Sequence, residues 1–234
     1  MKAMVFAAGR GIRLRPLTDT RPKALVEVAG RTLLEHVLRR LVEAGVTEAI
    51  VNLHHLGGQI PPFLEKHHRF GLRRVAYSQE PVLLDTGGGL KQAAWFFDDG
   101  NPFLVHNVDV LSDIDLGGLL LAHGRSQALA TLAVMARPTA RPLYFDANGR
   151  LVGRCSPGKG NEFVQTPHGK TVTLGFCGIQ AVSPAIFGKM SETGAFPLAE
   201  AYLRLAGAGE AILAHRVDGA KWRDCGRPED LCPL

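Results

Sequence analysis

Ala7-Ala8-Gly9-Arg10-Gly11-Ile12-Arg13-Leu14-Arg15-Pro16-Leu17-Thr18 follows directly on the apolar run Met4-Val5-Phe6. Glycines without a Cβ let backbone N–H groups turn toward a ligand, and a concave row of such donors binds anions. Arginine offers a planar fork and lysine a mobile point charge, and both suit phosphate oxygens. The cations in and just after the loop are Arg10, Arg13, Arg15, Arg21 and Lys23. The stretch therefore predicts a polyphosphate site at the end of a first strand.

Two other phosphate loops do not fit this segment. A Walker A loop needs four residues between its first glycine and Gly-Lys-Ser/Thr, and that pattern is absent here. A dinucleotide fingerprint needs a third glycine, but Leu14 stands at that position. A merely solvated basic loop is the plain alternative to a ligand site.

Length and composition indicate one soluble domain spanning residues 1–234. We find no apolar run of the roughly 18 residues that a membrane span needs and no leading signal segment, so we expect a cytoplasmic protein without a membrane partner. The net charge is +5, but six cations and one anion lie in the first twenty-five residues, which favours a small-molecule site over a nucleic-acid groove. The four cysteines lack Cys-x-x-Cys spacing, so we expect free thiols.

Short apolar runs alternate with amphipathic ones along the chain, as in strands joined by crossover helices. We expect helices at 32–43, 60–66 and 90–97, and a hairpin and loop within the Gly- and Pro-rich region 149–169. The expected strands are 2–7, 49–53, 74–77, 103–106, 130–135, 143–145, 174–180 and 212–216. The pattern predicts a three-layer α/β/α domain.

Ligands in such sheets bind beyond the carboxyl ends of the strands, so a second chemical group is expected after another strand. Phe103-Leu104-Val105-His106 runs into Asn107-Val108-Asp109. Mg²⁺ prefers carboxylate oxygens and usually keeps water and substrate phosphates as its other ligands. Asp109 is the first candidate ligand, although residue type alone leaves Asp113 and Asp115 open.

The glycine loop resembles that of the sugar-phosphate nucleotidyltransferases, written Gly-x-Gly-Thr-Arg-Leu-x-Pro-Leu-Thr and then Pro-Lys. The matching residues are Gly9, Gly11, Arg13, Leu14, Pro16, Leu17, Thr18, Pro22 and Lys23. Ile12 departs from the family's usual threonine. The likeness covers residues 2 to about 230 and is closest to short bacterial members, such as N-acetylmuramate 1-phosphate uridylyltransferases and mannose 1-phosphate guanylyltransferase-like proteins. It implies a Rossmann-like fold with a mixed, mostly parallel sheet.

The resemblance also implies a metal site. Asn107-Val108-Asp109 is similar to the family's Asn-Gly-Asp motif, with Val108 in place of glycine. Trp222-Arg223-Asp224-Cys225-Gly226 is similar to its Trp-x-Asp-x-Gly motif. Asp109 and Asp224 are thus the expected ligands of Mg²⁺.

Glu80 and the segment Leu84-Asp85-Thr86-Gly87-Gly88-Gly89 resemble the family's base-recognition segment. Successive glycines opening a helix would let a flat base lie against the backbone, so Glu80, Thr86, Gly87 and Gly88 are expected near the base or ribose. An ordinary glycine-rich turn is the alternative.

The acceptor site is the least defined part of the sequence. The family's Glu-Lys-Pro triplet, whose lysine meets the sugar phosphate, is absent. The nearest candidates are Asn161, Glu162 and Gly175, the last lying in a segment that looks like the family's Phe-x-Gly-Ile strand.

The resemblance implies transfer of a nucleoside monophosphate from a triphosphate, UTP or GTP, to a sugar 1-phosphate, with release of pyrophosphate. Arg13, Lys23 and Asp109 are the expected catalytic residues, Arg13 for the leaving phosphates and Lys23 for charge at the α-phosphorus. The expected nucleotide-binding residues are Ala7, Ala8, Gly9, Arg10, Gly11, Ile12, Arg13, Lys23, Glu80, Thr86, Gly87, Gly88 and Asn107. We expect a monomer or small homo-oligomer. A non-catalytic nucleotide sensor on the same fold is the alternative, whereas a nicotinamide-dependent oxidoreductase is disfavoured because no acidic residue ends the second strand near Asn52.

Overall fold

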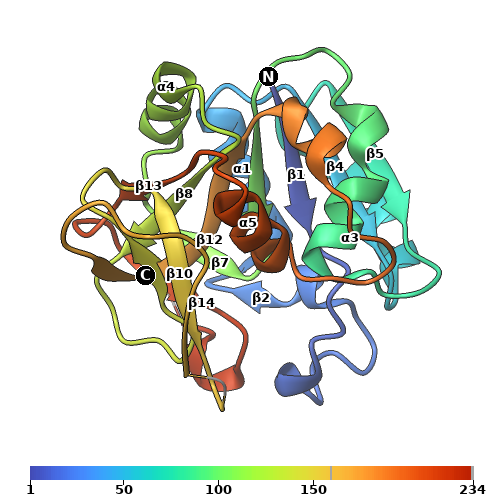
Figure 1. The fold of residues 1–234 in the computed structure, drawn as a ribbon. Coiled ribbons are helices and arrows are strands. Elements are labelled where there is room, and N and C mark those ends of the chain that lie inside the picture. The colour runs from blue at the N-terminus through green and yellow to red at the C-terminus, as the bar shows by residue number, and fades with distance from the viewer. Residues whose placement is uncertain (159, 233–234) are drawn as a thin grey trace.

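A ten-stranded mixed sheet forms the middle layer of the molecule (Figure 1). The computed structural model describes residues 1–158 and 160–232. The main path of neighbouring strands is β11-β10-β9-β12-β6-β1-β4-β5. The long strand β12 also pairs with β8, and β8 pairs with β13. The strands are β1 (Lys2–Phe6), β4 (Glu48–Leu53), β5 (Arg74–Gln79), β6 (Phe103–Asn107), β8 (Ala130–Met135), β9 (Leu143–Phe145), β10 (Leu151–Ser156), β11 (Gly160–Phe163), β12 (Val172–Val182) and β13 (Ile212–Arg216).

The strands that carry the glycine loop and Asp109 are parallel neighbours. β1 pairs in parallel with both β4 and β6, with Phe6 opposite Asn107. Their carboxyl ends therefore open on the same edge of the sheet. Two small ribbons lie outside the main sheet, β2 (Glu27–Val28) with β3 (Arg31–Thr32) and β7 (Val110–Ser112) with β14 (Trp222–Asp224).

Helices cover both faces of the sheet and divide the core in two. One face carries α1 (Leu33–Glu43), α2 (Ile60–Lys66) and α4 (Leu116–Ser126). The other carries α3 (Asp85–Gln92) and α5 (Leu198–Gly207), which lie in front of the sheet in Figure 1. This arrangement confirms the predicted three-layer fold.

Helix α1 forms because its apolar residues recur at helical spacing and its first turn is capped. Leu34, Leu38 and Leu41 recur at helical spacing and are all buried against the sheet. The Thr32 hydroxyl accepts a hydrogen bond from the Glu35 amide at 3.1 Å and caps the first turn.

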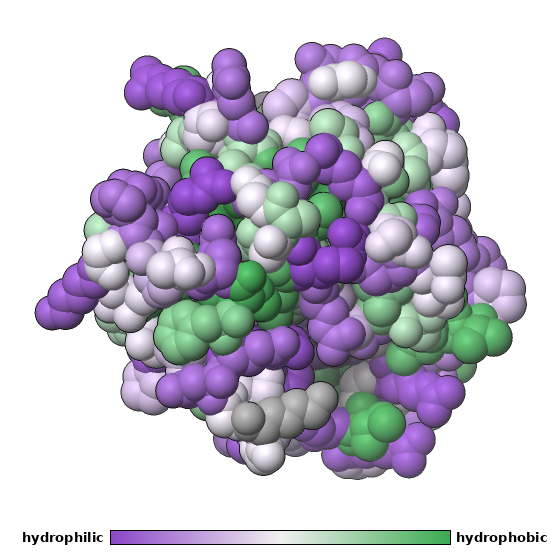
Figure 2. Space-filling view, viewed as in Figure 1, coloured by the Kyte–Doolittle hydropathy of each residue, from purple (hydrophilic) through white to green (hydrophobic). Residues whose placement is uncertain are grey.

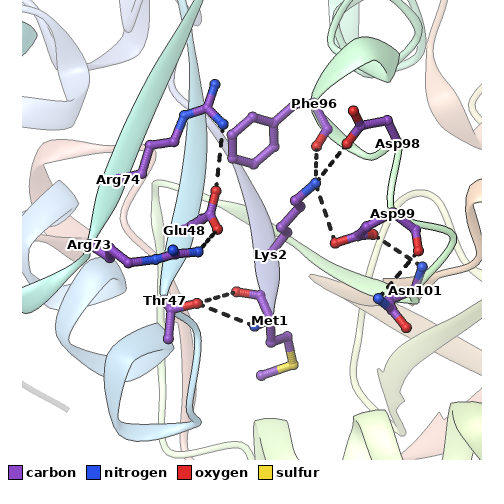
Figure 3. A network of polar contacts seen from close by, with 10 residues as sticks. All are labelled: Met1, Lys2, Thr47, Glu48, Arg73, Arg74, Phe96, Asp98, Asp99 and Asn101. Carbon is purple, nitrogen blue, oxygen red and sulfur yellow. Dashed lines mark hydrogen bonds and ion pairs between the residues drawn. The ribbon is translucent and has the colours of Figure 1, made fainter.

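A polar network fixes the amino ends of the strands, at the edge opposite the glycine loop (Figure 3). The Lys2 ammonium donates to the Phe96 carbonyl at 2.7 Å and to Asp98 at 2.9 Å. Glu48, at the start of β4, pairs with Arg73 and Arg74. Burial lowers the pKa of Lys2, but the hydrogen bonds to Asp98 and Asp99 outweigh it and raise the pKa above its usual value.

Most expected elements lie where the sequence pattern puts them. The strands at 130–135, 143–145 and 212–216 and the helix at 60–66 match residue for residue, and the expected hairpin after residue 149 is β10–β11. The expected helix at 90–97 has the wrong bounds: α3 begins at Asp85 and ends at Gln92, and a short 3₁₀ helix, Ala94–Phe96, follows. α4, α5 and the β7–β14 ribbon were not predicted. The four cysteines are free, as expected, and no helix in the described ranges has the length and apolar character needed to cross a bilayer.

Candidate active site

The glycine loop leaves β1 at Phe6 and turns through the short 3₁₀ helix Ile12–Leu14. Gly11 adopts φ +63°, and a Cβ there would lie 2.8 Å from the Thr18 side chain and 3.2 Å from the Lys23 Cβ. The Thr18 hydroxyl closes the turn by donating to the Gly11 carbonyl at 2.8 Å. Glycine is needed here because both the conformation and the space exclude a side chain.

The amide groups of the loop divide into two sets. Those of Ala7 and Ala8 donate to the Asn52 side-chain oxygen, at 2.7 and 3.3 Å, so they serve the protein's own structure. Those of Gly9, Arg10 and Gly11 have no acceptor in residues 1–158 and 160–232. The Ala7 and Ala8 amides are thus already engaged, and the amides from Gly9 to Gly11 are the candidates for the predicted anion-binding row.

Lys23 and Asp109 form an ion pair at the centre of the site. Lys23 is buried and opens a short 3₁₀ helix beside the loop, whereas Asp109 follows β6 and is half-buried. The two residues are 86 positions apart in the chain. The fold thus joins two of the three expected catalytic residues.

Strand pairing brings the Trp-x-Asp-x-Gly motif, residues 222–226, next to Asp109. β14 runs antiparallel to β7, with Asp224 opposite Val110, and the Cys225 amide donates to the Asp109 carbonyl at 2.7 Å. Desolvation raises the pKa of the Asp224 carboxyl group, the Asp109 carboxylate adds to the rise, and Lys23, the Gly226 amide and Arg13 oppose it. Repulsion between the two carboxylates is the electrostatic condition in which a bound cation stabilises both.

Arg13 lies beside Asp224 at the same edge of the sheet. A Cβ on Gly226 would stand 2.6 Å from its guanidinium nitrogen and 2.7 Å from the Asp224 carboxylate, so Gly226 leaves the room that both groups occupy. Arg13, Lys23, Asp109 and Asp224 therefore meet, although they come from three distant parts of the chain.

A cavity of about 450 Å³ opens beside these groups. Gly9, Lys23 and Asp109 line one side, and Asp85 and Thr86 line another. The remaining lining residues are Phe6, Ala8, Asn52, Leu83, Asn107, Val108 and Ala195. The size suits a nucleotide, and Lys23 and Gly9 bring a cation and a loop amide to its lining.

Comparison with known proteins decides the family. The family model described as nucleotidyl transferase matches residues 2–148. The chain belongs to the nucleotidyl transferase family. N-acetylmuramate alpha-1-phosphate uridylyltransferase of Neisseria meningitidis is 52% identical over 116 residues, 49% of each chain. The catalytic subunit beta of mannose-1-phosphate guanylyltransferase from Dictyostelium discoideum is 27% identical over 99% of this chain and 62% of its own.

The alignments thus span about half to three fifths of the length of these two relatives. Among solved structures, a UDP-glucose pyrophosphorylase from Acinetobacter baumannii superposes with a TM-score of 0.78 at 22% identity, over 98% of this chain and 90% of that one. At that identity the likeness shows the fold alone.

In this nucleotidyl transferase the glycine-rich segment 84–89, predicted to recognise the base, packs against residues 194–196. The amides of Gly87 and Gly88 donate to the Phe196 carbonyl, at 2.9 and 3.3 Å. A Cβ on Gly87 would lie 2.3 Å from the Phe196 ring, and one on Gly88 2.4 Å from the Gly194 carbonyl. The glycines inside α3 thus admit the 194–196 segment, and their amides are not free to read the edge of a base. The placement of Gly87 and Gly88 near the base or ribose stays a prediction. Thr86 does line the cavity, and its hydroxyl accepts from the Leu198 amide at 2.9 Å.

Glu80 is buried behind the cavity. Its carboxylate accepts from the Asn52 amide at 2.7 Å and from the Leu84 amide at 3.0 Å. Asn52 in turn holds the start of the glycine loop. Glu80 therefore positions Asn52, and its contact with a nucleotide stays a prediction. Sequence reasoning missed Asn52, whose signal was a polar amide in the otherwise apolar run 49–53.

The two departures from the family motif fall in different surroundings. The Ile12 side chain is 59% exposed, whereas Val108 is buried, packs in the α1-side core and borders the cavity. Asn107 also borders the cavity, and its side-chain amide fills the space that a Cβ on Gly178 would take, 2.9 Å away.

The expected acceptor residues do not lie beside Arg13, Lys23, Asp109 and Asp224. Asn161 and Glu162 are exposed on β11, which β10, β9 and β12 separate from β6. Asn161 accepts from the Tyr144 hydroxyl at 2.7 Å, and Glu162 pairs with Arg154 at 3.0 Å. Gly175 lies under the Arg137 guanidinium, 2.9 Å from where its Cβ would be. The Asn161 and Glu162 side chains are therefore engaged within the β9–β10–β11 part of the sheet, with Tyr144 on β9 and Arg154 on β10.

Proposed function

We propose that this protein transfers a nucleoside monophosphate from UTP or GTP to a sugar 1-phosphate and releases pyrophosphate. One observation carries the proposal: the glycine loop, Arg13, Lys23, Asp109 and Asp224 meet at one edge of the sheet beside a cavity of about 450 Å³. The names of the relatives, a uridylyltransferase and a guanylyltransferase, support both nucleotides and acceptors such as N-acetylmuramate 1-phosphate and mannose 1-phosphate.

The residues fit a magnesium ion. Asp109 and Asp224 offer hard oxygen ligands and lie close enough for one carboxylate to raise the pKa of the other. Within the part of the chain that the structure describes, no cluster of three or more histidine, cysteine, aspartate or glutamate side chains could hold a metal by itself. Water and substrate phosphates would complete the coordination, as is usual for Mg²⁺. When bound, Mg²⁺ supplies charge neutralisation to the reacting phosphates.

The chain's own groups account for the rest of the chemistry. A phosphate monoester is an adequate nucleophile near neutral pH, so catalysis requires positioning and neutralisation of charge more than a general base. The free amides from Gly9 to Gly11 and the Arg13 guanidinium would hold the leaving phosphates. Lys23, held in place by Asp109, would neutralise charge at the α-phosphorus.

The first test is pyrophosphate release with Mg²⁺ from UTP and GTP in turn against N-acetylmuramate, mannose and glucose 1-phosphates. We expect turnover with one nucleotide, loss of turnover when Mg²⁺ is chelated, and at least about 100-fold loss in Asp224→Asn. Asp218→Asn is the matched control, because Asp218 pairs with Arg216 at 2.7 Å, away from the site. Tight nucleotide binding without turnover in every combination would support the sensor instead.

A further inference from the structure

The β7–β14 ribbon, which carries Asp224, lies outside the ten-stranded sheet. In the part of the chain that the structure describes, β14 pairs with β7 and with no strand of that sheet. Trp222 and Asp224 are two positions apart on β14, so their side chains point to the same face of the ribbon, about 7 Å apart along the strand. A contact that fixes the Trp222 ring therefore also limits where the Asp224 carboxylate lies.

A bulge in β12 attaches the ribbon to the main sheet. The register of β12 on β8 shifts between residues 176 and 180, and a bulge of this kind leaves main-chain groups unpaired in the ladder. The Cys177 carbonyl, inside the bulge, accepts a hydrogen bond from the Trp222 indole Nε1–H at 2.8 Å. Gly178 adopts φ +74°, and a Cβ on it would lie 2.8 Å from the Val110 side chain on β7. The bulge thus contacts both strands of the ribbon.

Arg137, just after the end of β8, lies over the indole ring. Its guanidinium carbon is 4.0 Å from the centroid of the Trp222 ring. Its Nη2 group donates to the Phe176 carbonyl at 2.7 Å, where the bulge begins. Gly175 leaves room for the side chain, since a Cβ there would lie 2.9 Å from the Arg137 Nε atom. Arg137 therefore joins β8, β12 and the ribbon.

The contacts of Arg137 indicate that the indole ring, and not an acidic group, determines where its side chain lies. Among residues 1–158 and 160–232 it forms no ion pair with an aspartate or glutamate. Its Nε atom is buried without a hydrogen-bond partner. A planar guanidinium stacks on an aromatic face in a way that the ammonium group of lysine does not reproduce.

We propose that Arg137 is a positioning residue for the metal site, because its stack on Trp222 holds β14 so that Asp224 lies beside Asp109. The proposal rests on the metal site of the proposed function. Metal–ligand distances tolerate deviations of only about 0.2 Å, so a ribbon free to turn would lose affinity for the ion. Groups that orient metal ligands typically change metal affinity by about 10–100-fold when they are replaced.

A competing role follows from a groove of about 530 Å³ beside the amino end of α5, which Arg137, Arg141 and Arg154 help to line. Figure 2 shows the face that carries α5, where hydrophilic side chains surround an apolar hollow. An anionic acceptor in the groove could contact Arg137 directly. The experiment must therefore separate such a contact from positioning of Asp224.

The test measures Mn²⁺ binding to the protein, from the electron paramagnetic resonance signal of free Mn²⁺, without nucleotide or turnover. Arg137→Met should weaken binding about tenfold, because Asp224 is no longer held in place. Arg137→Lys, the second variant, keeps the charge without the planar stack and should weaken binding in the same direction. Arg141→Met is the matched control in the same loop. Loss of a positive charge alone favours a bound cation, so its Mn²⁺ affinity should be unchanged or slightly higher.

The outcomes separate the two proposals. Mn²⁺ affinity equal to or above that of the wild type in both folded Arg137 variants overturns the positioning role and leaves the transferase function standing. A higher KM for the sugar 1-phosphate with unchanged Mn²⁺ affinity assigns Arg137 to the acceptor and also overturns it. Weaker Mn²⁺ binding in the variants, with no pyrophosphate release by the wild type, supports the positioning role and overturns the proposed function. Absence of Mn²⁺ binding to the wild type overturns the metal site and the positioning role with it. Circular dichroism and Tm confirm that each variant folds.

Discussion

The Lys23–Asp109 pair puts opposite charges side by side where the substrate's phosphates are expected. Both side chains are largely shielded from solvent, at 10% and 20% exposure, so their interaction is screened less than a surface pair. The ion pair holds the ammonium beside the cavity instead of letting it extend into water. A residue of this kind positions charge before the substrate arrives, which is the condition for electrostatic catalysis.

Lys23→Met removes that charge and keeps a side chain of similar length. We expect kcat to fall at least about 100-fold, because the developing charge at the α-phosphorus loses its fixed partner. Circular dichroism should be unchanged, and added Mg²⁺ should raise the Tm of the variant more than that of the wild type, since Asp109 is left uncompensated. Lys66→Met, at the exposed end of α2, serves as control. Turnover within a few-fold of wild type would remove Lys23 from the mechanism.

At the level of elements, Asn52 ties three strands to the loop. It lies in β4, accepts from the first loop amides after β1, and donates to Glu80, which follows β5. One buried side chain therefore holds the start of the glycine loop, whereas the later part is held by its own contacts, such as the Leu14 amide on the Gly11 carbonyl at 2.8 Å.

Asn52→Leu should destabilise the fold by about 1–3 kcal/mol and raise the KM for the nucleotide, because the Ala7 and Ala8 amides lose their acceptor. Chemical denaturation and initial rates measure the two effects. Asn101→Leu, in an exposed turn after Asp99, should change neither. A wild-type KM in Asn52→Leu would show that the loop is held by other contacts.

These contacts mark how far the sequence could predict the structure. The position of the loop, Lys23 and Asp109 beyond the strand ends was predictable from short contiguous stretches of sequence, whereas Asp224 was predicted only from its resemblance to the family's Trp-x-Asp-x-Gly motif. The Asn52 link joins residues 45 positions apart, and nothing local reveals it. The three successive glycines indicate that another group packs closely against α3. The sequence does not say whether that group is a ligand or, as in this structure, Phe196.

On the scale of the whole molecule, the sheet separates two cores, and polar groups buried among them respond to pH. His106 on β6 is buried on the α1 side, behind the site, and its Nδ1 lies 2.8 Å from the Asn107 carbonyl. Burial lowers its pKa to about 4, with Arg40 adding to the drop while the hydrogen bond and Asp109 oppose it. His123, between Thr131 and Ser183, has its pKa lowered by burial as well.

Because the His106 pKa is about 4 in the folded protein and 6.5 ordinarily, the unfolded chain binds the proton first as pH falls. Its contribution to stability is complete above about pH 6.5 and declines toward pH 4, by about 2 kcal/mol at pH 5. In His106→Asn, the loss of unfolding free energy between pH 8 and pH 5 should therefore shrink by about that amount relative to wild type. His168→Asn, an exposed substitution, should keep the wild-type pH dependence. Denaturant unfolding at pH 8 and pH 5 measures the unfolding free energy of both variants. If His106→Asn loses as much unfolding free energy between these pH values as the wild type, protonation of the buried imidazole does not cause the loss of stability in acid.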